Sequence, residues 1–272
     1  MKFLGVVFLA IFALTLTRAC GAAEEYAPMT ASVVGMKGTV HITKTGATTP
    51  YQAKVGDALA KGDKVETKGD GDVSIKTENG NVVTLGPNSQ IIISELSLNK
   101  TTGDYRTVMD SKFGKLQARV EAKIKDHAKS TFEIRTPTAV CGVRGTVFYV
   151  VVGDTGVTQV FVASGSVNFG DPAGQNTFVV VENAAAAADL AGTVTELTGA
   201  EKDAIVAEYN AFLAAGGGEE GGPDAPPAPS QQNDPQSLTE VTPLPVQELE
   251  PQKPPSPSSG SSEESTEYSV GI

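Results

Sequence analysis

The chain of 272 residues contains no tryptophan, two histidines and two cysteines. Common zinc sites need three or four histidine or cysteine ligands at short spacing, and the sequence offers no such cluster. Nucleophilic catalysis needs a nucleophile beside a base, and neither His41 nor His127 is close in sequence to Cys141. Phosphate-loop, nucleophile-elbow and HExxH motifs are also missing. We therefore predict a non-enzymatic protein without catalytic, cofactor-binding or metal-ligating residues; an enzyme with an unrecognised site is the alternative.

Long apolar runs are scarce. The one candidate, residues 3–16, follows Lys2 and contains fourteen residues, FLGVVFLAIFALTL. A bilayer-spanning helix needs about 20 apolar residues, so this length is typical of a signal-peptide core. We expect a signal peptide over residues 1–23 and no membrane span after its removal. The alternative is a lipid anchor at Cys20, although Thr17-Arg18-Ala19 departs from the usual approach to an acylated cysteine.

Loss of Cys20 with the signal peptide would leave Cys141 as the single cysteine, so no intrachain disulfide is expected. Stability would then depend on a hydrophobic core. A lone cysteine in an exported protein suggests catalysis or redox chemistry, but no histidine lies near Cys141 in the sequence. We interpret Cys141 as a buried small apolar residue.

Short runs of β-branched residues separated by turn sequences extend from about Ala31 to Leu197. Asn79-Gly80 stands between two such runs and is the strongest hairpin signal. No helical periodicity alternates with these runs, which disfavours a parallel α/β fold. We predict one all-β domain over residues 31–197, an antiparallel β-sandwich or a short solenoid-like stack.

The most basic stretch, Lys112 to Lys129, contains six lysines and arginines. Alternation around Leu116 and Ala118 predicts a strand with one solvent-exposed face. Nucleic-acid binding is disfavoured, because the chain carries a net charge of −11.

Thr198, with Glu201 three residues later, resembles a capping box, and five apolar residues then share one helical face. These are Ile205, Val206, Tyr209, Phe212 and Leu213. We predict one helix over residues 198–215, ended by Gly216. Residues 216–272 hold eleven of the sixteen prolines and ten acidic residues against one lysine. Such a composition predicts a disordered acidic, proline-rich tail.

Residues 136–152, TPTAVCGVRGTVFYVVV, form the most distinctive stretch. Pro137 favours extended geometry at Thr136, and two glycines flank Val143-Arg144. This pattern predicts a half-buried hairpin in which both glycines adopt positive φ and Arg144 lies at the bend. Arg144 would either link turn carbonyls and a carboxylate, which we favour, or recognise a partner. The candidate turn and recognition residues are Thr136, Pro137, Gly142, Arg144, Gly145 and Thr146.

The segment TPTAVCGVRGT, together with the block VGDALAKGDKVET at residues 55–67, resembles the FecR domain family. This resemblance implies an all-β envelope domain and localisation in the periplasm or exterior of a Gram-negative bacterium. The family's namesake transmits a receptor's state to a cytoplasmic sigma factor, which requires a cytoplasmic N-terminal region and a membrane span. In this chain two residues, Met1-Lys2, precede the apolar run.

Two non-enzymatic functions follow from these observations. The first is a cell-envelope binding or scaffold module whose partner is an envelope protein or a polysaccharide, with the tail as a spacer. The second is a periplasmic component of a FecR-type signalling relay. The sequence leaves the partner, the anchoring state and the oligomeric state open.

Overall fold

The computed structural model describes residues 25–121 and 129–217. The predicted signal peptide with Cys20, the residue His127 and the predicted tail from residue 218 onward lie outside these ranges. The signal peptide and the tail therefore stay predictions. Within the described residues, no helix is long and apolar enough to cross a membrane.

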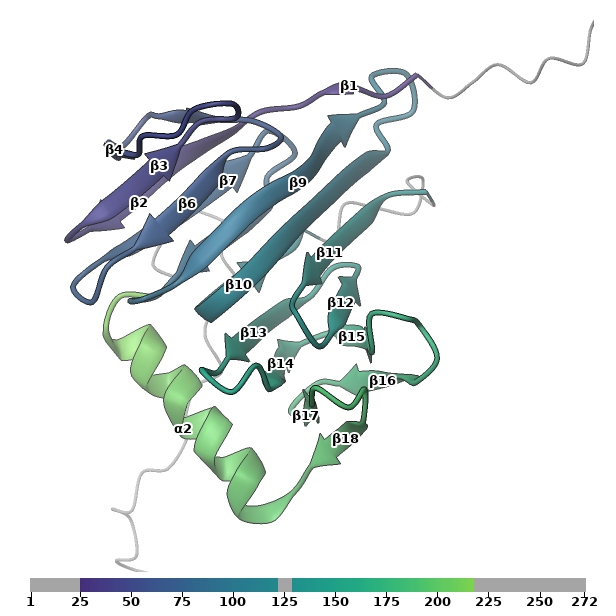
Figure 1. The fold of residues 1–272 in the computed structure, drawn as a ribbon. Coiled ribbons are helices and arrows are strands. Elements are labelled where there is room, and N and C mark those ends of the chain that lie inside the picture. Colours follow the sequence, from purple (N-terminus) through teal and green to yellow (C-terminus); the bar gives the residue numbers. More distant parts are fainter. Residues whose placement is uncertain (1–24, 122–128, 218–272) are drawn as a thin grey trace, which may run out of the picture. The chain divides into compact units, whose positions relative to one another are not determined.

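The described chain forms two β-sheets, here called sheet A and sheet B (Figure 1). Sheet A runs in the order β4 (Tyr51–Gln52), β3 (Val40–Thr43), β6 (Lys64–Thr67), β9 (Gln90–Leu98), β10 (Tyr105–Arg119), β11 (Thr131–Arg135), β12 (Val140–Val143), β15 (Ser166–Gly170) and β16 (Thr177–Val181). The short β1 (Ala27–Pro28) pairs with the end of β9.

Sheet B runs in the order β5 (Ala58–Leu59), β2 (Ala31–Lys37), β7 (Asp72–Thr77), β8 (Val82–Leu85), β10, β13 (Val147–Val152), β14 (Thr158–Ser164), β17 (Ala185–Ala188) and β18 (Val194–Leu197). The chain alternates between the two sheets as it proceeds. This arrangement confirms the predicted all-β fold, a sandwich built as a short stack. The β7–β8 hairpin at Asn79-Gly80 is also confirmed, with Gly80 at φ 96°.

Strand β10 belongs to both sheets. Residues Tyr105 to Phe113 pair with β9 in sheet A, and Gly114 to Arg119 pair with β8 and β13 in sheet B. Gly114 has φ 90°, and a Cβ atom there would lie 2.4 Å from the carbonyl oxygen of Asn88. Because only glycine fits this position, Gly114 allows one strand to pass from sheet A to sheet B.

The pairing of β10 with β11 is parallel, whereas the other strand pairs of the described residues are antiparallel. A parallel pair needs a crossover connection between its strands. Here the connection leaves sheet A within β10 itself, because residues 114–119 of β10 lie in sheet B before the chain returns to β11 in sheet A. Our expectation of antiparallel structure is therefore correct apart from this one pair.

The core lies between the two sheets and consists of inward-facing aliphatic and aromatic side chains. The largest that are fully buried include Phe132, Phe148, Phe169, Ile42 and Leu85. Alternation along each strand places these residues inward and polar residues outward, as in β11, where Phe132 and Ile134 are buried and Thr131 and Arg135 are exposed.

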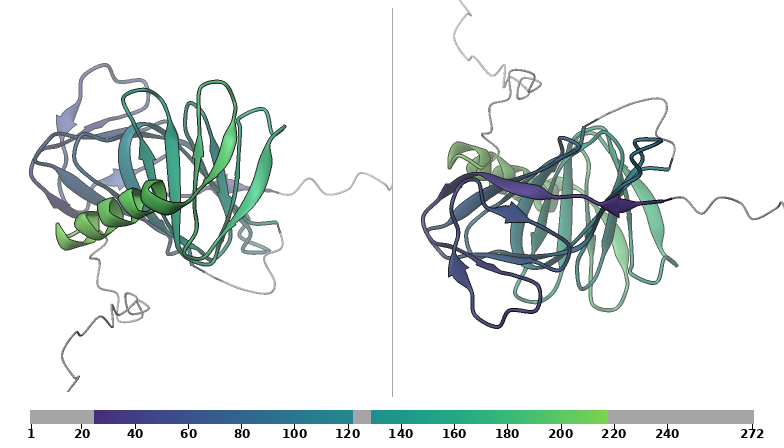
Figure 2. Two further views of the ribbon diagram at one scale, coloured as in Figure 1. Left: turned by 90° about the horizontal axis from the view of Figure 1, so that it is seen from below. Right: turned by 90° about the horizontal axis from the view of Figure 1, so that it is seen from above.

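Helix α2 (Gly199–Ala214) packs on the outer face of sheet B, against β14 and β17 (Figures 1 and 2). Ile205, Tyr209 and Phe212 are buried there, as the predicted helical face requires. Gly216 follows at φ 95° and donates its N–H to the carbonyl of Leu213, which ends the helix. The expected capping box is wrong in detail, because Thr198 occupies the N-cap position without a side-chain hydrogen bond.

The helix also changes the environment of the basic strand segment. Gln117 is buried and donates to the hydroxyl of Tyr209 at 3.1 Å, and Lys115 pairs with Glu208 at 3.2 Å. The predicted solvent-exposed face is therefore covered at Gln117 and partly covered at Lys115. Alternation along one strand cannot reveal that a helix about 90 residues later covers it.

Candidate binding groove

Three neighbouring strands of sheet A place Glu133, Gly142 and Asn168 in one row across its outer face. Glu133 of β11 pairs with Gly142 of β12, and Gly142 pairs with Asn168 of β15. Their chain neighbours Ile134, Cys141 and Phe169 point inward and are fully buried. The outer face therefore carries two polar side chains with a glycine between them.

A groove follows this row and consists of two adjoining hollows that both include Glu133, Gly142 and Asn168. The first hollow has a volume of about 330 Å³ and ends at Ser130 and Arg144. The second has a volume of about 790 Å³ and ends at a loop. Its further lining residues are Asp110, Arg135, Thr136, Val140, Gly170, Asp171, Pro172, Gly174 and Thr177.

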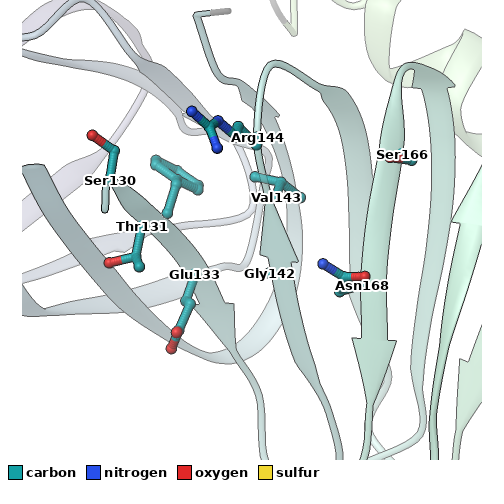
Figure 3. Close-up of a pocket in the computed structure, with 9 residues that line it drawn as sticks. Ser130, Thr131, Glu133, Gly142, Val143, Arg144, Ser166 and Asn168 are labelled. Carbon is teal, nitrogen blue, oxygen red and sulfur yellow. The ribbon is translucent and has the colours of Figure 1, made fainter. Parts of the chain in front are cut away.

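Figure 3 shows the first hollow, with Thr131 and Glu133 on the β11 side, Ser166 and Asn168 on the β15 side, and Arg144 at one end. The floor is low where Gly142 lacks a side chain. A Cβ atom at Gly142 would have Asn168 Cβ and Asn168 O as its nearest neighbours, both at 3.9 Å. The absence of a side chain thus leaves space that the surroundings do not fill.

Charged groups of both signs line the groove. Arg135 donates to Glu133 Oε2 from Nη2 at 2.7 Å and from Nε at 3.1 Å. Asp110 accepts from Ser94 Oγ at 2.7 Å and lies 3.8 Å from Lys112 Nζ. Asp171 is 7% exposed and accepts the backbone N–H of Asn176 at 2.7 Å. These carboxylates therefore already have partners within the protein.

The expected hairpin at residues 136–152 is wrong. Strand β12 pairs with β11 and β15 in sheet A, whereas β13 pairs with β10 and β14 in sheet B. The Val143 to Thr146 segment therefore carries the chain from one sheet to the other. Both strands are buried between other strands, so they gain more pairing and more apolar burial in separate sheets than as an isolated hairpin.

Arg144 lies in this crossing segment, is exposed to solvent and lines the groove. It lies close enough to Tyr105 to affect the phenol. Burial raises the pKa of Tyr105, and the nearby Asn81 side chain and the positive charge of Arg144 partly oppose that rise. Whether Arg144 is structural or recognises a partner stays a prediction.

The two glycines beside Arg144 differ in backbone conformation. Gly145 has φ 63°, as expected. Gly142 lies within β12 and is not among the residues with positive φ, so the expectation for Gly142 is wrong. Gly142 leaves space in the groove because it lacks a side chain. Gly145 adopts the positive φ with which the chain passes from sheet A to sheet B.

Thr136 and Thr146 form hydrogen bonds that hold the segment in place. Thr136 Oγ1 accepts the N–H of Ala139 at 2.8 Å, which closes the turn that contains Pro137. Thr146 is 1% exposed and donates to the carbonyl oxygen of Ser166 at 2.8 Å. Both side chains therefore have internal partners.

Cys141 is buried in the core, as predicted. Burial raises the pKa of its thiol to about 12, so the nucleophilic thiolate is scarce at neutral pH. In the parts of the chain that the structure describes, no three histidine, cysteine or acidic side chains come together to hold a metal ion.

The glycine-aspartate block at residues 55–67 has an internal role. Asp63 accepts the backbone N–H groups of Thr45 and Ala60 and pairs with Lys44 at 2.7 Å. Burial by itself raises the pKa of Asp63, but Lys44 and the backbone donors outweigh this effect, and the pKa lies below its ordinary value. The carboxylate thus joins residues 44–45 to the turn at residues 60–63.

The sequence did not predict the groove residues Asp110, Glu133, Arg135, Asn168 and Asp171. Four of them lie within predicted β-branched stretches, and Asp171 directly follows one. The sequence pattern does not indicate which strands become neighbours, and the row depends on that pairing.

Fold and site together define an all-β domain with a polar groove on one sheet. Residues 63–168 match the family model described as FecR protein. This match confirms the resemblance found in the sequence over residues 63–168. No curated protein matches the chain.

Two crystal structures of a "putative anti-sigma factor" from Parabacteroides distasonis are similar to this chain. The first is 18% identical, with a TM-score of 0.41, and the match covers 55% of this chain and 63% of that one. The second is 17% identical, also with a TM-score of 0.41, and the match covers 53% of this chain and 64% of that one. The matches thus span less than two thirds of those proteins.

Proposed function

We propose that this protein is an exported, non-enzymatic FecR-domain protein that binds a component of the cell envelope through the groove of sheet A. The observation that carries the proposal is the row Glu133–Gly142–Asn168, where a missing side chain leaves a polar hollow on an otherwise regular sheet. Polar side chains that already have partners within the protein favour binding, because they lose little conformational entropy when a ligand associates.

The partner that we propose is an envelope protein or a polysaccharide. The groove offers the Asn168 amide, the Glu133 carboxylate and the Arg135 and Arg144 guanidinium groups, which can donate to and accept from peptide groups or sugar hydroxyls. The acidic net charge of −11 disfavours nucleic acid as a partner.

The FecR match favours a second candidate, a role as a component of a FecR-type signalling relay. In that case the groove would bind a protein whose state changes, and binding would alter transcription of target genes. Deletion of the gene would then change the transcript level of a defined gene set, whereas loss of a scaffold would not.

Retention of the purified full chain by washed cell envelopes tests the groove. Asn168→Trp fills the hollow, and Lys76→Trp places the same side chain on an exposed strand position of sheet B as a matched control. We expect Asn168→Trp to weaken retention at least about tenfold, or about 1.4 kcal/mol, and Lys76→Trp to leave it unchanged. Equal retention of both variants would contradict the proposal.

Treatment of the envelopes before the assay identifies the partner class. Loss of retention after proteolysis indicates a protein, and loss after glycan digestion indicates a polysaccharide. Arg144→Ala separates the two roles of that residue in the same assay. If Arg144→Ala loses retention while its free energy of unfolding is unchanged, Arg144 is a recognition residue. If retention and the free energy of unfolding fall together, Arg144 is structural.

A further inference from the structure

Strand β16 is an edge of sheet A. It pairs with β15 on one side, and no second strand pairing of β16 occurs among the described residues, where β17 pairs with β14 and β18 instead. An unpaired edge presents N–H and C=O groups that can pair with another strand, and proteins usually protect such edges with lysine, proline, bulges or a covering element. The sequence of β16, Thr-Phe-Val-Val-Val, contains none of these protective residues, and its register with β15 is regular.

The outward side chains of β16 are unusually apolar for an exposed sheet. Val179 and Val181 are 56% and 57% exposed, and both lie on the outer face next to β15. Val180 between them points inward and is 2% exposed. A partner that adds a strand here would cover both exposed valines and satisfy the free edge at the same time.

The pattern of β16 is complementary to itself. If two copies pair antiparallel with Val180 on the two-fold axis, Val179 of one copy lies opposite Val181 of the other on the same face. Each exposed valine then forms a cross-strand apolar pair, the kind of pair that stabilises a sheet. Residues 179–181 carry no charge, and Glu182 lies opposite Phe178 in this register, so no like charges stand directly opposite each other.

We propose that a second copy of this chain pairs with β16 and joins the two A sheets into one continuous sheet. This inference goes beyond the proposed function and does not depend on the groove. A strand pair this short is smaller than a standard stable interface, which buries about 1,600 Å². We therefore expect a weak dimer whose population rises with protein concentration.

Sedimentation of the full chain over a dilution series tests the dimer. In Val179→Lys/Val181→Lys, each lysine would face a lysine of the partner, so this variant should be monomeric at concentrations where the unsubstituted chain dimerises. The control Val55→Lys/Leu190→Lys adds the same charge at positions that are 62% and 74% exposed and should dimerise normally.

A cysteine experiment tests the register. A mixture of Val179→Cys and Val181→Cys chains should form a disulfide between positions 179 and 181 under mild oxidation, in higher yield than either chain alone. A monomer at every concentration, an unchanged dimer in the double-lysine variant, or the absence of this disulfide would each overturn the proposal. A strand supplied by another protein would leave the purified chain monomeric and would overturn it as well.

Discussion

The side-chain oxygens of Thr136 and Thr158 lie 2.7 Å apart and join the two sheets by a hydrogen bond. Thr136 follows β11 in sheet A, and Thr158 begins β14 in sheet B. Thr138 completes the group, with its hydroxyl 2.8 Å from that of Thr158 and 2.9 Å from the carbonyl oxygen of Gly156. The Thr-Pro-Thr sequence therefore fixes the turn after β11 against the hairpin of the opposite sheet.

Thr158→Val should lower the free energy of unfolding by about 1–3 kcal/mol. Valine has nearly the same shape, but it leaves the hydroxyls of Thr136 and Thr138 with fewer partners at a position that is 0% exposed. Denaturant unfolding measures the change. Thr131→Val, at an exposed position of β11, is the control and should change stability by less than about 0.5 kcal/mol. Equal losses of unfolding free energy at both positions would show that the Thr158 hydroxyl stabilises the fold no more than the hydroxyl of an exposed threonine.

Gly145→Val should lower the free energy of unfolding by about 1–2 kcal/mol or more, because φ 63° is strained for any β-branched residue. Gly142→Ala is the matched control from the same motif. Its backbone is not in the positive-φ region and its nearest contacts lie at 3.9 Å, so we expect a change within about 0.5 kcal/mol. Thermal or denaturant unfolding of both variants decides the comparison, and a larger loss for Gly142→Ala would contradict it.

The two glycines show how far the sequence could predict this structure. Short β-branched runs and Asn79-Gly80 depend on local chemistry, and the strands and hairpin that they predict are present. Gly142 and Gly145 also indicate a change of direction, but local signals cannot determine whether the flanking strands pair with each other. That choice depends on burial against β11, β15, β10 and β14, which lie elsewhere in the sequence.

The groove could not be predicted from the sequence for a related reason. Glu133, Gly142 and Asn168 are separated along the chain and become a row only through strand register. Residues 184–188 are five consecutive alanines, and four of them form β17. Ala185 belongs to the cluster of apolar side chains beneath α2, and Ala186 and Ala188 belong to the core between the sheets. Small side chains on both faces allow α2 to approach the sheet closely.

The stability of the domain should fall in acid in a way that depends on Asp63. Its pKa in the folded protein lies below the ordinary value of 3.8, so its contribution is complete above that value and is lost as the pH falls through the lower folded pKa. Denaturant midpoints of the unsubstituted chain and Asp63→Asn, measured from pH 7 down to about pH 2, test this linkage. The difference between the two chains should shrink with decreasing pH, and a constant difference would contradict the assignment.

The last prediction concerns the packing of α2 on sheet B. The Phe212 ring lies with its centroid 5.2 Å from that of Tyr149, and a Cβ atom at Gly86 would be 2.9 Å from Phe212 Cε2. Phe212→Ala should therefore cost about 3–5 kcal/mol, the usual range for a buried aromatic residue. Gly86→Ala should weaken helix docking by displacing the same ring.

Tyr209→Phe distinguishes helix packing from hydrogen bonding at this interface. The variant keeps the ring 5.3 Å from Phe161 but removes the hydroxyl that accepts from Gln117, so the expected cost is about 0.5–1.5 kcal/mol. Hydrogen exchange of amides in residues 199–214 provides the local measurement. Faster exchange in Phe212→Ala and Gly86→Ala, with little change in Tyr209→Phe, is expected because the rings and not the single hydrogen bond hold the helix. Unchanged exchange in Gly86→Ala would contradict this prediction, because it would show that the Phe212 ring moves away from residue 86 without loosening the helix.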